Sequence, residues 1–334
     1  MKKYFITFVS AIMAVTSVFA QSTFVATLSH GNDISIFYGS YALRDAFEAA
    51  DNGDIINLSG GAFQAVDITK AVTIRGTGID NANSTHIVND FNINIPSTVE
   101  NRFTMEGVRC DGTMYLRGQY SNPYFMRCRF ATVYVGYSSD DNVKNALFAN
   151  CKITGIMYSC GASTSQAVNS FFIGTATSSS SCALYINCII WDSNLSDDER
   201  SELYNSILVN TDSWHYALPS SSVATNCVAI GYDNTSYYSK PFDNLVSSTG
   251  CTTSTYEEMF KSFNGEYSDE QTFELTDAAK AKFLGADGTQ VGLYGGVLPY
   301  TSTPSYPQIT KLNADNKTTT DGKLNVVIEV GAAQ

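Results

Sequence analysis

Apolar and polar positions in the middle of the chain follow a long repeat rather than a helical period. Five segments begin with Asn, continue with Cys or Ser, and run through three mostly β-branched or aromatic residues. They begin at Asn150, Asn169, Asn187, Asn205 and Asn226, in steps of 19, 18, 18 and 21 residues. Arg127-Cys128 and Arg109-Cys110 extend the series toward the N-terminus in steps of 23 and 18. A period of this length over seven units is typical of a solenoid.

Each of the five Asn units predicts a short strand closed by a turn. The apolar residues are followed by a residue that tolerates positive φ, namely Gly155, Gly174, Asp192, Asn210 and Gly231. Units of 18 to 23 residues are too short for paired helices, and they contain few strong helix formers. We therefore predict an all-β fold, a right-handed parallel β-helix (solenoid).

The residues beside the repeated Asn or Arg predict two structural columns. Small side chains at one point of every coil would form an internal stack in which Cys replaces Ser as a small hydrophobe; its cysteines are Cys110, Cys128, Cys151, Cys188 and Cys227. Neighbours on parallel strands fit disulfide geometry poorly, so we expect free thiols, with disulfides as the alternative. Cys160 and Cys182 are better disulfide candidates, and the pairing of Cys251 stays open.

The asparagines themselves predict a second column. We expect a ladder in which each amide bonds the amide or backbone of the next coil. A row of sugar-binding amides is the alternative interpretation.

Other segments of the chain predict how the rod ends. Leu43, Ala46, Phe47 and Ala50 have helical spacing, which predicts a helix over 40–50, with Ser40 as N-cap, that covers the first coil. After the coils, 256–263 and 277–284 are short helical candidates, and 309–312 and 324–330 follow a proline-containing linker as strands. The predicted organisation is a signal peptide at 1–20, an N-terminal cap at 21–53, coils at 54–232, a C-terminal flank at 233–300, and linker plus strands at 301–334.

The later coils are apolar on both strand faces, although only one face can line the interior. The pairs that would face outward include Phe171 and Ile173, Ile189 and Trp191, Ile207 and Val209, and Val228 and Ile230. The earlier coil instead places Lys152 and Thr154 there, as expected for a face in water. We expect residues 233–300 to cover the later coils, with a partner or a second copy as the alternative.

The N-terminus and the charge indicate compartment and partners. Lys2 and Lys3, an apolar run to Val18 and the ending Val18-Phe19-Ala20 are typical of a secretory signal peptide, which predicts a secreted or surface location. No transmembrane segment is expected after signal removal; an N-terminal anchor is the alternative. The formal net charge of −12 argues against nucleic acid, because neutralising phosphates needs clustered Lys and Arg. It also repels polyanionic glycans unless a cation intervenes.

Residues near both ends of the mature chain carry a resemblance to a known family. The segments 42–50, 53–58 and 70–76 resemble the opening of pectin-lyase-like right-handed β-helix proteins. The segment 288–296, followed by a proline-containing link and 321–330, is similar to secreted proteins of Bacteroides-type bacteria. The resemblance covers most of the mature chain and implies the fold. The superfamily includes lyases, hydrolases, adhesins and proteins of no assigned activity, so no single function follows.

Candidate chemistry lies in the loops. A β-helix lyase would need a Lys or Arg base and carboxylates holding calcium. Asp192, Asp212 and His215 are the catalytic candidates, Trp214 and Tyr216 the sugar-stacking candidates, and Asp140, Asp141, Asp197 and Asp198 the calcium candidates. The structural alternative is that these carboxylates shape solvated turns and that the aromatics pack on the rod. Nothing in the sequence requires a cofactor, and calcium is the one that these candidates suggest.

Three hypotheses for the function follow. The leading one is a secreted or surface β-helix that binds an extracellular glycan or surface polymer without complete catalytic machinery, which suits the 20 tyrosines and the lack of a full catalytic set. The second is a polysaccharide lyase or glycoside hydrolase. The third is a structural or adhesive surface component that self-associates through its apolar face or its C-terminal strands.

Overall fold

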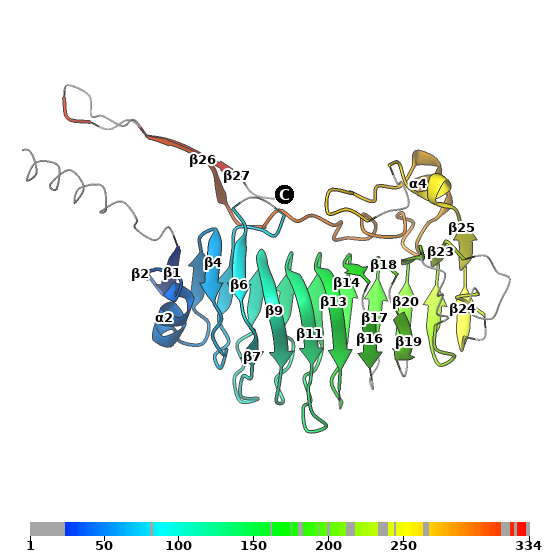
Figure 1. The fold of residues 1–334 in the computed structure, drawn as a ribbon, viewed down its shortest axis with the longest axis horizontal. Helices are drawn as coiled ribbons and strands as arrows, with labels where there is room; N and C mark the ends of the chain where they lie inside the picture. The colour runs from blue at the N-terminus through cyan, green and yellow to red at the C-terminus, as the bar shows by residue number, and fades with distance from the viewer. Residues whose placement is uncertain are drawn as a thin grey trace, which may run out of the picture.

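The chain folds into an all-β rod, a parallel β-helix with a cap at one end and a flank along one side (Figure 1). The computed structural model describes residues 24–331 with gaps at 81–82, 161, 175, 180–182, 193, 199–200, 212–217, 233–239, 244, 263–266, 315–320 and 324–325. Consecutive coils contribute strands in register to two long sheets, so the predicted fold is confirmed.

The first sheet begins with an antiparallel pair and continues with parallel strands. Its order is β2 (Asp33–Tyr38), β1 (Val25–His30), β3 (Ile55–Leu58), β5 (Thr73–Arg75), β8 (Thr104–Glu106), β10 (Tyr124–Met126), β12 (Ala146–Ala149), β14 (Ser165–Val168), β17 (Ala183–Ile186), β20 (Ser201–Tyr204), β22 (Val223–Thr225) and β24 (Ser247–Thr249).

The second sheet runs beside it along the rod. Its order is β4 (Gly61–Gln64), β6 (Thr85–Val88), β9 (Val108–Leu116), β11 (Arg129–Val135), β13 (Lys152–Ser159), β15 (Phe171–Ile173), β18 (Ile189–Trp191), β21 (Ile207–Val209), β23 (Val228–Ile230) and β25 (Thr252–Ser254). Three more strands belong to this sheet outside that order: β7 (Phe91–Ile93), β16 (Ala176–Ser179) and β19 (Asn194–Asp198). β7 pairs with β9, and β16 pairs with β13 and β19.

The repeated asparagine is the corner between the two sheets. All five have φ between 46° and 54°, a left-handed conformation that Asn tolerates better than most residues. Arg127 takes the same corner with φ 52°, and Gly107 and Gly250 take it in the coils at either end of the series with φ 66°. The sequence repeat therefore records a backbone requirement at each corner.

The register corrects one member of the predicted column. β8 pairs with β10 so that Glu106 lies opposite Met126, which aligns Gly107 with Arg127. Arg109 lies opposite Arg129, and Cys110 lies opposite Phe130, so this pair does not belong to the corner series. The positive φ expected after the strands is present at Gly174, Asp192 and Gly231 but not at Gly155 or Asn210.

Small side chains stack inside the rod beside the corners. Cys128, Cys151, Cys188 and Cys227 are fully buried free thiols, as predicted. The Cys188 thiol donates to the Ala167 carbonyl of the preceding coil at 3.4 Å, and the Ser170 hydroxyl donates to Phe148 at 3.1 Å. Cys and Ser are thus interchangeable here as small side chains that donate to a carbonyl of the preceding coil. Cys110 is also a buried free thiol, although at a different position, and Cys160 is free; Cys182 lies outside the described residues.

Asn150 and Asn169 use their side chains to bond the C-terminal flank and not, as the predicted ladder requires, the next coil. The Asn169 amide donates to the carbonyls of Leu293 at 2.7 Å and Gly295 at 2.8 Å, both in the C-terminal flank. The Asn150 side chain accepts from the Thr301 amide at 2.7 Å. Backbone amides make the contact between coils instead, because the corner turns the side chain outward. The corner column is where the flank attaches.

We expect Asn169→Ala to loosen the flank. The variant loses two hydrogen bonds and places a less tolerant residue at φ 46°, which together should lower the free energy of unfolding by about 2–3 kcal/mol. Asn169→Gly keeps the backbone geometry and loses only the amide contacts, so it should cost less. Urea unfolding of both variants separates the two effects, and equal midpoints would contradict the corner role.

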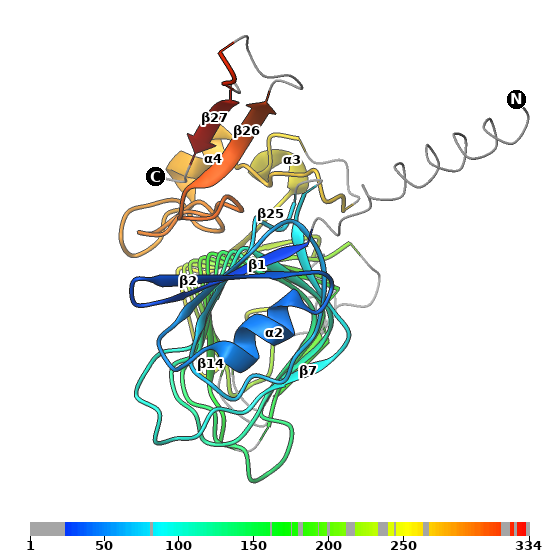
Figure 2. The same ribbon diagram turned by 90° about the vertical axis from the view of Figure 1, so that its left-hand side faces the viewer.

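The N-terminal end is closed by α2 (Ala42–Ala49), which lies across the mouth of the rod (Figure 2). Its Leu43, Ala46 and Phe47 are buried, as their spacing predicted. The predicted cap was wrong, because Tyr41 precedes the helix and makes no side-chain cap hydrogen bond. The Ser40 carbonyl instead accepts from the Gln64 amide at 2.8 Å, so Ser40 joins the cap to β4.

The flank covers the apolar outer face of the later coils, as predicted. Phe171, Ile189 and Trp191 form one buried cluster with flank residues that include Phe273 and Leu293. The flank contains α3 (Tyr256–Met259) and α4 (Asp277–Lys282), which begin after the hydrogen-bonding caps Thr255 and Thr276.

The chain ends in an antiparallel hairpin of β26 (Gln308–Ala314) and β27 (Val326–Gly331), which points away from the rod (Figure 1). Within the described residues, no helix is long and apolar enough to cross a membrane.

Candidate functional site

The sequence places most of its catalytic and sugar-stacking candidates in the loop that contains Asp212. Asp212, Trp214, His215 and Tyr216 lie outside the described residues. Asp192 is described, and both of its carboxylate oxygens accept hydrogen bonds from Thr211, from the amide at 2.6 Å and from the hydroxyl. Asp192 therefore links two successive coils at the turn after β18, where its own φ is 42°.

Two of the four carboxylates proposed for calcium, Asp140 and Asp141, belong to no group of metal ligands among the described residues. Asp141 Oδ1 accepts from the Gly118 amide at 2.7 Å, and Oδ2 accepts from the amides of Tyr137 and Ser138 at 2.7 and 2.9 Å. Asp141 thus holds a turn, whereas Asp140 is exposed. Asp197 and Asp198 lie in β19, and their side chains are outside the description. No three His, Cys, Asp or Glu side chains among the described residues gather as metal ligands.

Asp141 makes the stability depend on pH. Burial works against its charged form, but the hydrogen bonds from Tyr137, Gly118 and Ser138 outweigh burial and hold its pKa below the ordinary value. The folded state then binds fewer protons, so the stabilisation is complete above pH of about 4 and is lost as pH falls through the lowered pKa. We expect Asp141→Asn to cost about 1–3 kcal/mol at pH 7 and progressively less in acid. Urea midpoints at pH 7 and pH 3 check this, and a cost independent of pH would contradict it.

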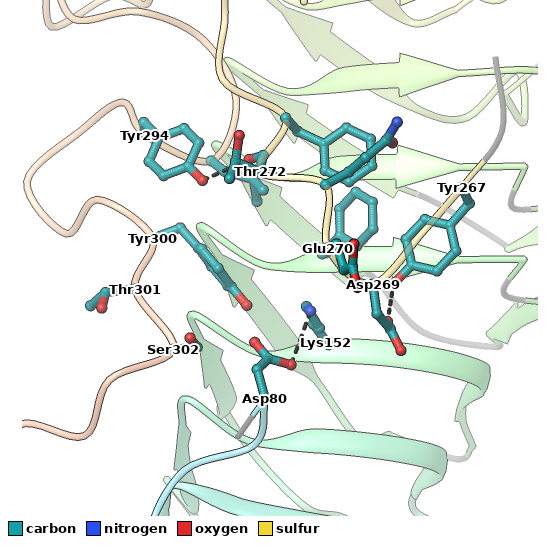
Figure 3. A pocket seen from close by; sticks show the side chains of 14 residues that line it. Asp80, Lys152, Tyr267, Asp269, Glu270, Thr272, Tyr294, Tyr300, Thr301 and Ser302 are labelled. Atoms are coloured by element: carbon teal, nitrogen blue, oxygen red, sulfur yellow. Dashed lines mark hydrogen bonds and ion pairs between the residues drawn. The ribbon is translucent and has the colours of Figure 1, made fainter. Parts of the chain in front are cut away.

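One cavity among the described residues lies where the flank meets the second sheet, with a volume of about 270 Å³ (Figure 3). Aromatic rings and polar groups both line it. The lining residues are Asp80, Lys152, Phe171, Tyr267, Asp269, Glu270, Gln271, Thr272, Phe273, Leu293, Tyr294, Tyr300, Thr301 and Ser302.

An ion pair between a buried lysine and a partly exposed aspartate forms the floor of this flank cavity. Lys152 stands at the start of β13, and its Nζ lies 3.1 Å from Asp80 Oδ1. The Lys152 side chain is only 9% exposed, because the flank covers it. The expectation of a lysine in solvent was therefore wrong.

A second charged group lies beside the floor. Arg129 lies 2.9 Å from Asp269, which also accepts from the Tyr267 hydroxyl. Burial works against the charged form of Asp269, but the hydrogen bonds from Tyr267 and Arg129 hold its pKa below the ordinary value. At neutral pH the Asp269 carboxylate is therefore charged, and its oxygens already accept hydrogen bonds from Arg129 and Tyr267.

Tyr300 supplies an unused polar group. Its hydroxyl is buried and has no hydrogen-bond partner among the residues that the structure describes, and it points toward Lys152 and Asp80 (Figure 3). Burial and then the negative charge of Asp80 raise its pKa well above the ordinary value. The phenol therefore stays protonated at neutral pH and can donate to a bound acceptor. An unpaired buried hydroxyl costs about 1–3 kcal/mol, which a ligand would recover.

A second set of tyrosines lies on the second sheet, away from this cavity. The rings of Tyr115 and Tyr134 stack with centroids 5.2 Å apart, Tyr158 lies 5.4 Å further along, and Arg117 covers the Tyr115 face. A sugar stacks on a free aromatic face. Because these rings cover one another, the row offers edges and hydroxyls rather than a stacking surface.

Sequence inspection missed the flank cavity because most of its lining residues lie outside the repeat. Asp80, Lys152 and Tyr300 come from three separate segments, and only the docked flank brings them together. The tyrosine-rich composition was the one available signal, and it gave no position. No family model, curated protein or solved structure matches this chain.

Proposed function

We propose that this protein is an exported β-helix that binds a neutral, hydroxyl-rich glycan in the flank cavity and does not cleave it. The observation that carries the proposal is the unpartnered buried hydroxyl of Tyr300 beside the Lys152–Asp80 pair. The same proposal includes an export signal in residues 1–20 and kinship with the pectin-lyase-like proteins of Bacteroides-type bacteria. The parallel β-helix fold is compatible with both.

The composition of the flank cavity supports a carbohydrate. Sugar sites combine aromatic walls with a few polar groups that fix orientation. Here Tyr294 and Phe273 supply rings, while Thr301 and Ser302 supply hydroxyls at the rim. The volume of about 270 Å³ suits a short stretch of chain rather than a folded partner.

Charge favours a neutral glycan over an acidic one. Asp80, Asp269 and Glu270 outnumber Lys152 among the lining residues, and Lys152 is already paired. The formal net charge of −12 adds a repulsive field. A uronate would therefore have to displace Asp80 from Lys152.

The protonation states in the flank cavity support binding without catalysis. General-base work needs an unprotonated, accessible group near the substrate. Lys152 and Asp80 are held in one ion pair, Asp269 accepts from Arg129 and from the Tyr267 hydroxyl, and Tyr300 keeps its proton at neutral pH. The enzyme hypothesis therefore depends on the loop that contains Asp212 and His215, and the experiment below includes its products.

The test is a polysaccharide panel with the full exported chain. Neutral glucan, mannan and xylan stand beside polygalacturonate and alginate, each with and without calcium, and binding is measured together with released reducing and unsaturated ends. We expect binding to one neutral class, independent of calcium and without products. Product release, or binding to acidic polymers only, would overturn the proposal. Silence across all polymers would favour the structural, self-associating alternative.

Tyr300→Phe should separate binding from stability. The variant removes a hydroxyl that has no partner, so the free energy of unfolding should stay level or rise by about 1 kcal/mol. Affinity for the glycan should fall about tenfold, because one hydrogen bond to the ligand is lost. Isothermal titration and urea unfolding measure the two effects.

Tyr294→Phe is the matched control. The Tyr294 hydroxyl already donates to the Thr272 carbonyl at 2.6 Å. This variant should lose about 1 kcal/mol of stability and keep its affinity. Equal affinity losses in the two variants would contradict the role given to Tyr300.

A further inference from the structure

The last two members of the internal column are both cysteines. Cys227 and Cys251 follow the corner residues Asn226 and Gly250, and the Thr252 amide donates to the Cys227 carbonyl at 3.0 Å. Parallel neighbours lie about 4.8 Å apart, inside the Cα separation of about 4.4–6.8 Å that disulfides span. The Cys227 thiol donates to the Thr225 carbonyl at 3.4 Å and the Cys251 thiol donates to the Thr249 carbonyl at 3.7 Å, and the two thiols are close enough for each to shift the titration of the other.

An equivalent pair inside the rod provides the contrast. Cys128 and Cys151 also occupy consecutive coils, and their thiols donate to backbone carbonyls. Both are fully buried between neighbouring coils. Cys251 is partly exposed, because the described strands of the two sheets end at its own coil, with β24 and β25. A reagent in solution can therefore reach Cys251 but not the inner pair.

The environment of Cys251 also favours reaction. The hydrogen bond from Cys227 lowers the pKa of Cys251 to about 7, so much of it is thiolate, the nucleophilic form, at neutral pH. Burial raises the pKa of Cys151 well above the ordinary value, which keeps that thiol unreactive.

We propose that Cys227 and Cys251 are a redox-active pair that closes into a disulfide by exchange with a small-molecule disulfide. The Cys251 thiolate attacks one sulfur of the reagent, forms a mixed disulfide and releases one thiolate. Cys227, which is fully buried, then attacks the Cys251 sulfur and gives its proton to the departing reagent thiolate, so the second half of the reagent leaves as a thiol. Two protein thiols are oxidised and one disulfide is reduced to two thiols.

The bond would fasten the last coil to the coil before it. Because no described strand stacks beyond β25, this coil has room to shift toward the geometry that a disulfide needs. Thr255 and α3 follow β25 directly, so the same bond would secure the start of the flank.

The test uses the reduced full-length chain and glutathione disulfide. After incubation the native protein is alkylated, denatured, labelled with a second alkylating reagent and digested. Chymotrypsin is required, because the one basic residue between the two cysteines, Lys240, precedes Pro241 and resists trypsin. We expect a cross-linked peptide pair that contains Cys227 and Cys251. Cys128 and Cys151 should carry only the second label.

Serine variants supply the controls, because Ser170 and Ser206 already occupy column positions and show that the rod accepts serine there. Oxidation should raise the thermal unfolding midpoint of the wild type and of Cys151→Ser by several degrees, but not that of Cys227→Ser or Cys251→Ser. A wild type in which Cys251 stays free, or stops as the glutathione adduct, would overturn the proposal. An oxidised wild type with an unchanged midpoint would overturn the fastening role.

Discussion

Glu106→Ala is expected to lower the free energy of unfolding by about 3–5 kcal/mol, because it leaves a buried arginine without its partner. Arg127 Nη1 lies 2.8 Å from Glu106 Oε1, and both side chains are under 10% exposed. Glu106 also accepts from the amide and the hydroxyl of Ser305, at 2.7 and 2.9 Å. One carboxylate therefore serves both the rod and the segment that leads to the hairpin. Urea unfolding, followed by circular dichroism, measures the loss.

The double variant Glu106→Ala with Arg127→Gly tests the cause. Arg127 stands at a corner with φ 52°, where the neighbouring coil has Gly107. Glycine therefore fits the backbone there, and it removes the unpaired charge together with its strain. We expect the double variant to recover about 1–2 kcal/mol of the loss. A double variant less stable than Glu106→Ala would show that packing, rather than charge burial, sets the cost.

Phe273→Ala should release the flank while the coils stay folded. The Phe273 ring lies 4.7 Å from that of Phe171 and 5.5 Å from that of Trp191. Loss of a buried phenylalanine costs about 3–5 kcal/mol, and this side chain joins the flank to the outer face of the rod. Both Phe and Ala carry a Cβ, so the positive φ at this position disfavours them alike. Glycan affinity should disappear, because the flank forms one wall of the cavity.

Hydrogen exchange resolves where Phe273→Ala acts. The Thr276 amide, which donates to Met259 at 2.8 Å inside the flank, should exchange faster. The Phe171 amide, which donates to Cys151 at 2.8 Å between coils, should stay protected. Phe148→Ala is the control, since that ring lies inside the rod and its loss should loosen the coils. Equal loosening of both regions by Phe273→Ala would contradict a separately docked flank.

The rod could be predicted from the sequence because each coil repeats one backbone requirement. A left-handed corner selects Asn or Gly, and the interior beside it selects small side chains, so both columns show in the sequence. The repeat of Asn and Arg did not reveal Gly107 and Gly250 as corners, because glycine adopts the left-handed conformation as readily as asparagine but is a different residue. Arg109 matched the pattern by chance, and only strand pairing shows that it lies two residues from the corner.

The flank and its cavity could not be predicted in the same way. The outward apolar residues Ile189 and Trp191 indicated that the later coils are covered, but they did not indicate how many coils the flank covers. It reaches Lys152, which therefore becomes buried rather than solvated. The partners of the outward asparagine side chains could not be predicted either, because Leu293 and Thr301 lie in a segment that has no repeat. Contacts between distant, irregular segments leave no period in a sequence.

Hydrogen exchange of the full chain, with and without the neutral oligosaccharide that binds best, tests the central claim most directly. The account predicts slower exchange at residues 267–273 and 293–302 and at the Lys152 amide, with the rest of the rod unchanged. Protection confined to the tyrosine row of β9, β11 and β13, or to the C-terminal hairpin, would contradict it.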